Sequence, residues 1–320
     1  MLYEKLEGIS VPLSKLVMGS NAGMVTDDPK EAAECLDMAW EIGFRAFDTA
    51  HSYGTSEENI GAWMAKRGNR GELVLMDKGC NPGQAGSTDV FSGEMIREQL
   101  KMSLDRLQTD YVDIYALHRD DESRPVEEIV ETLHALKEEG KIRRFGGSNW
   151  KQYRIEMANR YAKEHGLSEF SVLGPAYSLA DYVRDPWGGS VSLSGEENRS
   201  YREWLVENQM PVLNYSSLAR GFLSGRFRSA DEAHIDQYLR EGTIKEYYDA
   251  ANMIRLRRAE ELAEKKGATV SQVCLAWLLA QEINLFPLIG ASTESHMREA
   301  AGAFDISLSE EECRWLHDVN

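Results

Sequence analysis

The sequence contains few cysteines and lacks the patterns of a secreted or membrane protein. The four cysteines among 320 residues show no paired spacing of the metal or redox kind, which predicts a reduced, cytoplasmic protein. No apolar run approaches the ~20 residues that a membrane-spanning helix needs. The first residues also lack the basic-then-apolar pattern of a signal peptide. We therefore expect a cytoplasmic protein with no membrane partner.

The chain also lacks an excess of positive charge. It carries 36 basic and 53 acidic residues, for a net charge of −17. This balance argues against a nucleic-acid partner, because binding to phosphate backbones requires clustered positive charge. A phosphorylated small molecule stays open as a ligand where basic groups gather locally, as they do at Arg220, Arg226 and Arg228.

Two common nucleotide-binding signatures are absent. Residues 19–23 follow the first predicted strand but do not fit the Gly-x-Gly-x-x-Gly pattern, and no phosphate loop ending in Gly-Lys-Ser/Thr occurs. Helix N-termini remain available to bind phosphate, and the candidates are residues 216–221 and 290–294.

Strand and helix patterns alternate along nearly the whole chain, as expected of parallel βα units. Eight strands are predicted, at residues 16–18, 45–50, 72–78, 112–118, 142–147, 170–177, 211–215 and 284–289. Helices are predicted at residues 29–43, 56–66, 92–107, 126–139, 151–164, from 294, and at 309–316, with Ser56 as one N-cap. This order predicts an α/β protein with a single (β/α)₈ barrel domain over residues 1–320. The long loops after strands six and seven, residues 179–197 and 218–251, then lie at the carboxyl face, where barrel enzymes build their sites.

Four polar residues, Asp48, Tyr53, Lys78 and His118, fall at or just beyond the ends of predicted strands. Alternation along a strand places Lys78 and His118 on the same face as apolar residues that suit a barrel interior. A buried lysine needs a partner, and Asp48 is the natural one. Taken singly, each residue fits a structural role better than a catalytic one. Their occurrence after three successive strands favours a site.

These four side chains predict proton-transfer chemistry without a metal or a nucleophile. A lysine cation beside the Tyr53 phenol is expected to lower its pKa from about 10, so that the phenol can give up a proton near neutrality. His118 could orient a substrate oxygen or share the proton.

The sequence resembles the aldo-keto reductase family over essentially its whole length. The matching motifs are GFRAFDTAHSYGTSE at 43–57, LMDK at 75–78, DIYALH at 113–118, GKIR at 140–143, GSN at 147–149, YSSLARG at 215–221 and GAS at 290–292. The resemblance implies a catalytic tetrad of Asp48, Tyr53, Lys78 and His118. In it, Tyr53 is the general acid in reduction of a small-molecule carbonyl substrate and the general base in oxidation of the alcohol.

The resemblance also implies a nicotinamide cofactor, bound without a Rossmann domain. Ser148 and Asn149 would hold its carboxamide, and Tyr215 would stack on the nicotinamide ring. The remaining expected cofactor contacts are Gly19, then Ser216, Leu218 and Gly221 at the pyrophosphate, and Ser292, Thr293, His296 and Glu299 at the adenosine end.

The chain departs from the family pattern at three places. Gly174-Pro-Ala replaces the phrase that usually carries a glutamine, His296 stands where arginine or glutamine is common, and Ala300 stands for an asparagine. Ser292 and Thr293, with His296 and Arg298, still favour NADP(H) over NAD(H).

Trp150 and Trp187 are the expected substrate contacts, since one follows Asn149 and the other lies in the loop after strand six. The polar composition of residues 187–196 favours a sugar or other polar carbonyl compound. Two alternatives stay open: a Schiff-base aldolase that uses Lys78, and a nucleotide-sensing binding module. The sequence does not indicate the oligomeric state.

Overall fold

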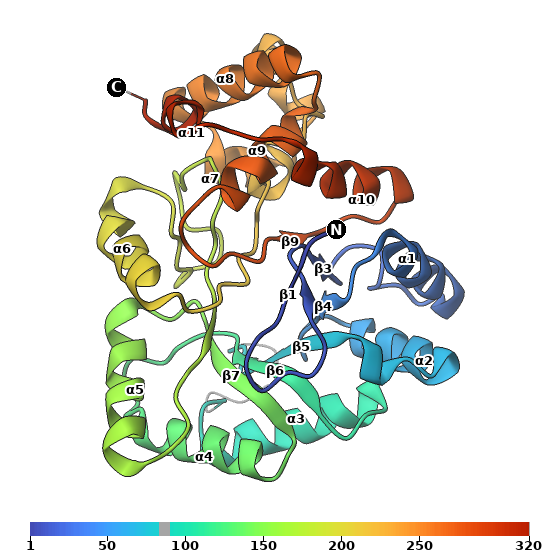
Figure 1. Cartoon of the computed structure of the whole chain (residues 1–320), viewed down its shortest axis with the longest axis vertical. Coiled ribbons are helices and arrows are strands. Elements are labelled where there is room, and N and C mark those ends of the chain that lie inside the picture. The colour runs from blue at the N-terminus through green and yellow to red at the C-terminus, as the bar shows by residue number, and fades with distance from the viewer. Residues whose placement is uncertain (83–89, 320) are drawn as a thin grey trace. The chain divides into compact units, whose positions relative to one another are not determined.

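A computed structural model of the chain describes residues 1–82 and 90–319 (Figure 1). The chain divides into two compact units. Unit 1 comprises Met1–Gly174 with Gly290–Glu294, and unit 2 comprises Pro175–Ile289 with Ser295–Asn320. The single domain over residues 1–320 stays a prediction. No helix among the described residues is long and apolar enough to cross a membrane.

Unit 1 contains six parallel strands that are neighbours in the sheet in chain order. These are β3 (Val17–Gly19), β4 (Ala46–Asp48), β5 (Val74–Gly79), β6 (Val112–Leu117), β7 (Ile142–Ser148) and β8 (Val172–Gly174). Every residue of β4, β5, β6 and β8 is buried, as expected for a parallel sheet covered on both faces. Because the strands are parallel, their carboxyl ends lie along one edge.

Five long helices follow strands β3 to β7 in turn, and consecutive helices lie side by side (Figure 1). They are α1 (Pro29–Ile42), α2 (Ser56–Arg67), α3 (Gly93–Leu107), α4 (Glu127–Glu138) and α5 (Gln152–His165). Local chemistry fixes their ends. Asp28 caps α1 by accepting the Lys30 N–H, and Gly43 ends it at a φ of 107° that glycine adopts easily. These helices confirm the predicted ones.

One predicted helix cap is wrong. Thr55, not Ser56, is the N-cap residue of α2, and it makes no side-chain capping bond. The Ser56 hydroxyl instead hydrogen bonds the Thr49 hydroxyl at 2.8 Å. Ser56 is fully buried, so its hydroxyl forms a hydrogen bond inside the turn between β4 and α2.

A short hairpin precedes the first parallel strand. It pairs β1 (Tyr3–Glu4) with β2 (Leu13–Ser14), and it was not predicted from the sequence. Strands of two residues carry no measurable alternation, which explains the omission. The Ser14 hydroxyl accepts the N–H groups of Arg45 and Ala46, and it thereby ties the hairpin to the start of β4.

Unit 2 is mainly helical. It contains α6 (Arg199–Asn208), α7 (Glu241–Tyr247), α8 (Ala250–Lys266), α9 (Val270–Leu279), β9 (Leu288–Ile289) and α11 (Glu310–His317). Helix α10 (Glu294–Ala301) begins on the last residue of unit 1. Helices α10 and α11 were predicted. Short 3₁₀ turns are η1 (Arg70–Glu72) in unit 1 and η2 (Glu196–Asn198), η3 (Ala219–Gly221), η4 (Ser229–Gln237) and η5 (Gly302–Asp305) in unit 2.

The last three predicted strands are shorter than expected. Residues 211–215 make only isolated bridges, at Val212 and Tyr215, and β8 and β9 cover only parts of their predicted ranges. Prolines explain the two truncations, because β8 ends directly before Pro175 and β9 begins directly after Pro287. Proline cannot donate to a ladder.

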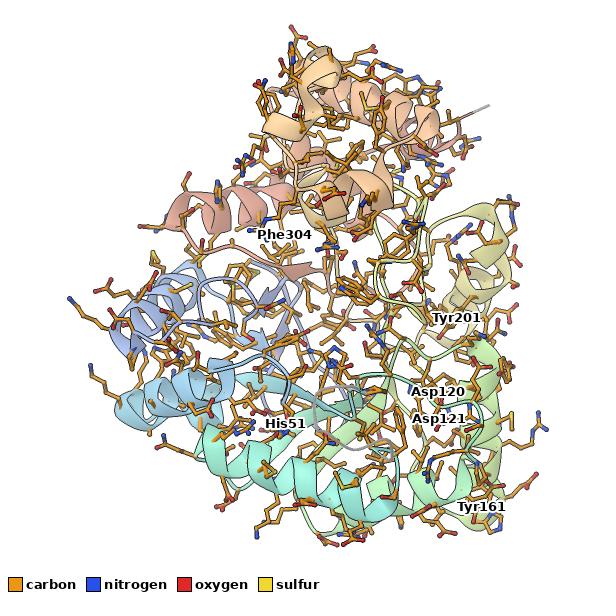
Figure 2. The ribbon with its side chains drawn as sticks, turned by 180° about the vertical axis from the view of Figure 1, so that it is seen from behind. His51, Asp120, Asp121, Tyr161, Tyr201 and Phe304 are labelled. Carbon is orange, nitrogen blue, oxygen red and sulfur yellow. The ribbon has the colours of Figure 1, made fainter. Side chains whose placement is uncertain are left out.

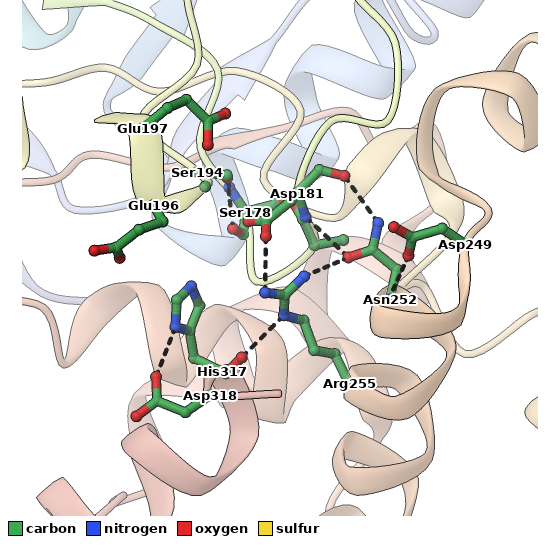
Figure 3. A network of polar contacts seen from close by, with 12 residues as sticks. Ser178, Asp181, Ser194, Glu196, Glu197, Asp249, Asn252, Arg255, His317 and Asp318 are labelled. Atoms are coloured by element: carbon green, nitrogen blue, oxygen red, sulfur yellow. Dashed lines mark hydrogen bonds and ion pairs between the residues drawn. The ribbon is translucent and has the colours of Figure 1, made fainter. Parts of the chain in front are cut away.

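The long loop after β8 is pinned within unit 2 by a buried polar network (Figure 3). Asn252 on α8 accepts the Asp181 N–H at 3.0 Å and donates to the Asp181 carbonyl at 2.8 Å. Arg255 pairs with the Asp181 carboxylate at 2.7 Å and donates to the His317 carbonyl at 3.0 Å. The network fixes the start of a loop that the sequence alone left without structure.

Candidate active site

The four predicted catalytic side chains come together in unit 1, at the carboxyl edge of its sheet. Asp48 is the last residue of β4, Lys78 lies in β5, and His118 follows β6 directly. Tyr53 lies in the turn that leads from β4 into α2. Parallel pairing places Lys78 opposite Ala116 of β6, so these residues occupy neighbouring strands at one level.

A buried ion pair joins Lys78 to Asp48. Lys78 is 4% exposed and Asp48 is 2% exposed. The Lys78 ammonium donates to the Asp48 carboxylate and, at 2.7 Å, to the Thr49 carbonyl. Burial is the largest single effect and lowers the pKa of Lys78, but the Asp48 carboxylate, Tyr53 and Asp77 together outweigh burial and raise this pKa. Lys78 therefore stays a cation.

The Tyr53 phenol lies above this cation. The Lys78 Nζ atom is 5.1 Å from the centroid of the Tyr53 ring. Burial raises the pKa of Tyr53, while Lys78 and Arg119 oppose the increase. The predicted lowering of this pKa is therefore wrong for this structure: desolvation of the phenolate exceeds the attraction of the cation. The phenol keeps its proton at neutral pH, which suits a proton donor.

His118 is an uncharged neighbour of Tyr53. The two rings meet edge to face with centroids 5.7 Å apart, and the His118 Nδ1 atom lies 3.5 Å from the Ser52 hydroxyl. Burial lowers the pKa of His118 well below its ordinary value, and Lys78 and Arg119 lower it further. The neutral imidazole can therefore accept or donate one hydrogen bond without bringing a charge.

The residues predicted to hold a carboxamide lie at the end of β7, beside His118. The Asn149 amide donates to the His118 carbonyl and to the Ser148 hydroxyl, both at 3.1 Å. The Ser148 hydroxyl donates to the Gly174 carbonyl at 2.8 Å. A Cβ atom at Gly174 would lie 3.2 Å from the Ser148 side chain. The glycine that replaces the expected glutamine thus lets the two backbones approach and holds Ser148 through its carbonyl.

Trp150, a predicted substrate contact, is 1% exposed. Its ring packs against Phe170, its Nε1 donates to the Arg119 carbonyl at 3.0 Å, and the Arg154 guanidinium lies 5.3 Å from the ring centroid. Arg154 in turn makes two hydrogen bonds to Asp120, at 2.8 and 3.0 Å, beside α5 (Figure 2). Trp150 therefore joins α5 to the segment that follows His118, and its substrate role stays a prediction.

In unit 2 the structure brings together Tyr215, Trp187 and Arg220. The rings of Trp187 and Tyr215 lie 6.0 Å apart, and the Arg220 guanidinium is 4.9 Å from the Trp187 ring and pairs with Glu246. Trp187 is 50% exposed, so one part of its surface is open to solvent. Sequence reasoning missed the pair of Tyr182 and Tyr247, whose ring centroids lie 5.2 Å apart in the same unit, because no motif marks either residue.

The segment predicted to line a pyrophosphate has an unusual backbone. Ser216, Ala219 and Arg220 have φ values of 55°, 49° and 53°, and Gly221 has 98°. Leu218 lies half-buried between them. Positive φ in several non-glycine residues costs free energy and recurs at ligand-binding segments.

Of the residues predicted at the adenosine end, Ser292 and Thr293 directly precede α10, whereas His296 and Glu299 lie on it. Ser292, Thr293 and His296 are exposed. Glu299 accepts a hydrogen bond from the Ser271 hydroxyl within unit 2. Gly19 ends β3 and pairs with Asp48 in register, so it lies at the same strand edge as the ion pair. Among the described residues, no cluster of three or more His, Cys, Asp or Glu side chains could hold a metal ion.

Known proteins resemble this chain over nearly its whole length. The model of the aldo/keto reductase family matches residues 15–320. The chain belongs to this family. Aldo-keto reductase str7 of Strobilurus tenacellus is 31% identical over 309 residues, which cover 95% of this chain and 84% of that protein. Norsolorinic acid reductase A of Aspergillus parasiticus is 30% identical, with 91% of this chain and 72% of that protein covered.

A solved structure supports the same assignment. A thermostable aldo-keto reductase, Tm1743, in complex with the inhibitor epalrestat, matches with a TM-score of 0.74 and 27% identity, over 99% of each chain. The predicted (β/α)₈ barrel fold is thereby confirmed, and the chain is an oxidoreductase of the carbonyl-reducing type.

Family membership implies a nicotinamide cofactor. The polar side chains of Ser148 and Asn149 in unit 1 fit such a group. A carboxamide needs both a hydrogen-bond donor and an acceptor. The Ser148 hydroxyl and the Asn149 amide are groups of this kind, buried at the end of β7, and they would exchange part of their bonds within the chain for bonds to the carboxamide. Asn149 has a φ of 61°, which turns the chain at this point.

Proposed function

We propose that this protein reduces an aldehyde or ketone to an alcohol, with Tyr53 as the proton donor. The observation that carries the proposal is the buried Lys78–Asp48 ion pair beneath the Tyr53 ring, with a neutral His118 beside it. Nothing in the stability of the sheet requires a buried ion pair there, since such pairs rarely add net stability.

Each residue of the site has a distinct task in this reaction. When bound, the nicotinamide cofactor supplies a hydride to the carbonyl carbon. The Tyr53 hydroxyl transfers its proton to the carbonyl oxygen, and this leaves a tyrosinate. The Lys78 ammonium stabilises the tyrosinate, and Asp48 keeps Lys78 charged and fixed in place. His118 hydrogen bonds the substrate oxygen and, because it is neutral, does not compete as an acid.

The cofactor contacts are proposed from the two units separately. Ser148 and Asn149 would hold the carboxamide, and Tyr215 would stack on the nicotinamide ring. The positive-φ segment with Ser216, Leu218 and Gly221 would line the pyrophosphate, and Gly19, Ser292, Thr293, His296 and Glu299 complete the set.

We propose NADP(H) rather than NAD(H) as the preferred cofactor. The exposed Ser292 and Thr293 directly precede α10, where a helix N-terminus favours a phosphate group. His296 lies in the first turn of α10 and Arg298 in its last turn. One relative, aryl-alcohol dehydrogenase [NADP(+)] of Phanerodontia chrysosporium, is 27% identical over 93% of this chain.

Fluorescence titration of the purified protein with NADPH and NADH in parallel tests the cofactor site. Saturable quenching of tryptophan emission with energy transfer to the dihydronicotinamide is expected, with NADPH the tighter ligand. Absence of saturable binding by both would remove the reductase proposal.

We propose a polar or sugar-like carbonyl as the substrate class, on the composition of residues 187–196 and the half-exposed Trp187 face. An aryl carbonyl is the second candidate, because relatives are named for norsolorinic acid and aryl alcohols. Steady-state kinetics on a matched panel of hydroxylated and aryl aldehydes separates them. Trp187→Ala should raise KM for the preferred class. Unchanged kinetics for every reactive compound would exclude Trp187 from the substrate site.

The two alternatives make different predictions. A Schiff-base aldolase would need an uncharged Lys78 amine, whereas its pairing with Asp48 favours the cation. Borohydride trapping with a keto substrate should therefore give no adduct. A nucleotide-sensing module would bind the cofactor tightly and turn over slowly with every carbonyl. We also propose a cytoplasmic, single-domain protein, and the four free cysteines are consistent with a reducing compartment.

A further inference from the structure

A partly buried arginine contacts the turn that carries Tyr53. Arg106, in the last turn of α3, donates to the Glu57 carboxylate at 2.9 Å. The same guanidinium nitrogen lies 3.4 Å from the His51 carbonyl and 3.3 Å from the His51 Nδ1 atom; His51 is labelled in Figure 2. His51 and Glu57 enclose the turn, so one side chain holds both of its ends.

Glu57 is unusual for a first-turn helix acid. It is fully buried, and the Arg106 guanidinium is its ion-pair partner. A buried carboxylate without a cation is strongly unfavourable, so Glu57 and Arg106 depend on one another. The two charges also suit their helices, since Glu57 lies at the N-terminus of α2 and Arg106 near the C-terminus of α3.

Gly61 allows this contact to form. A Cβ atom at Gly61 of α2 would lie 2.4 Å from the Arg106 carbonyl oxygen and 2.7 Å from the Leu107 carbonyl carbon. The backbones of α2 and α3 therefore meet where only glycine fits. This close approach brings the end of α3 under the turn.

The turn has one further bond to β5, the strand of Lys78, and one bond within itself. The His51 N–H donates to the Lys78 carbonyl at 2.8 Å, and the Tyr53 N–H donates to the Ala50 carbonyl at 2.9 Å. A shift of His51 would therefore move the backbone that carries Tyr53 relative to Lys78.

We propose that Arg106 is a positioning residue for the proton donor. Arg106 binds both ends of the turn 51–57 and thereby holds Tyr53 over Lys78. The inference rests on the proposed role of Tyr53. Misplacement of a reacting group by about 1 Å can cost roughly 100-fold in rate. Loss of the clamp should therefore lower kcat while leaving cofactor binding intact.

The test compares Arg106→Ala, Arg106→Lys and the control Arg97→Ala in the full chain. Arg97 lies on the same helix, where it pairs with Glu139 at 2.7 Å on the surface. We expect kcat to fall about 100-fold in Arg106→Ala, and about tenfold in Arg106→Lys, which keeps the charge but cannot reach both ends of the turn. The NADPH Kd should stay unchanged, and the solvent deuterium isotope effect on kcat should rise, because proton transfer becomes slower.

The results for the Arg106 variants and for Tyr53→Phe test the positioning role and the proton-donor role separately. If Arg106→Ala does not fold, Arg106→Lys decides alone. Wild-type kcat and isotope effect in the Arg106 variants, or a loss of NADPH binding in proportion to kcat, would overturn the positioning role. A Tyr53→Phe variant measured alongside separates this from the proposed function: full activity in Tyr53→Phe would remove the proton-donor role itself.

Discussion

Replacement of Lys78 by methionine is the perturbation that most sharply probes the electrostatics of the site. Methionine approximates the length of the lysine side chain but removes its charge. The distance between Lys78 Nζ and the Tyr53 ring centroid, 5.1 Å, is taken as the charge separation. At an effective dielectric constant of about 20, the attraction between the ammonium and a tyrosinate is then about 3 kcal/mol. Since each 1.36 kcal/mol is tenfold in rate, Lys78→Met should lower kcat by roughly 100- to 300-fold.

The same substitution leaves the Asp48 carboxylate buried without its cation. Loss of one partner of a buried pair costs about 3–5 kcal/mol of the free energy of unfolding. The double variant Asp48→Asn with Lys78→Met removes both charges, so stability should recover in part while kcat stays low. This separates the effect on stability from the effect on the reaction.

The assay is NADPH oxidation at saturating cofactor and carbonyl substrate, with urea unfolding measured on the same samples. Lys15→Met is the matched control, because Lys15 makes a 2.8 Å ion pair with Glu4 in the same unit but outside the site. A kcat for Lys78→Met within about threefold of wild type would refute the reasoning, since the estimated attraction would then have no effect on the transition state.

Three further predictions concern neighbouring residues. The pKa of His118 is lowered on folding, so near pH 6.5 the unfolded chain binds a proton that the folded protein does not bind. The free energy of unfolding should therefore fall as the pH drops below about 6.5. Urea unfolding of His118→Gln should lack this loss. Gly174→Ala should raise the NADPH Kd several-fold by displacing Ser148, whereas Gly71→Ala, where a Cβ meets no atom within 4 Å, should leave it unchanged in the same titration. Arg154→Ala should lower the free energy of unfolding by about 3–5 kcal/mol, and a urea midpoint within error of wild type would contradict this.

The regular part of the fold followed from the sequence because its signals are strong. Five helices with three to four turns each carry a clear apolar face, and residues such as Gly43 and Ser92 mark their ends. The strands of unit 1 are short, apolar and spaced by these helices. The alternation alone therefore identified the barrel.

The catalytic residues could also be found from the sequence, because polar residues at the ends of buried strands contradict the local pattern. Asp48 and Lys78 stand out for this reason, and the structure pairs them. The pKa of Tyr53 could not be predicted, since its direction depends on whether burial or the Lys78 cation dominates. A sequence gives the charge but not the extent of burial.

Contacts between residues distant in the chain were the parts that remained hidden. In the sequence, Glu57 has the pattern of an ordinary first-turn acid and Arg106 that of an ordinary surface cation of α3. Only the close approach of α2 and α3 at Gly61 shows that the two side chains pair. Burial of Trp150 likewise depends on Phe170, twenty residues later in the chain. Propensity and spacing carry no information on such pairs.

A single-turnover experiment with Tyr53→Phe tests the central claim most directly. The variant and the wild-type protein are saturated with NADPH and mixed with a reactive aldehyde, and oxidation of the bound cofactor is followed by absorbance. Removal of one phenolic hydroxyl should leave NADPH binding unchanged and slow oxidation by at least 100-fold, since a general acid contributes about 10²–10⁴-fold. Oxidation at the wild-type rate would show that Tyr53 is not the proton donor.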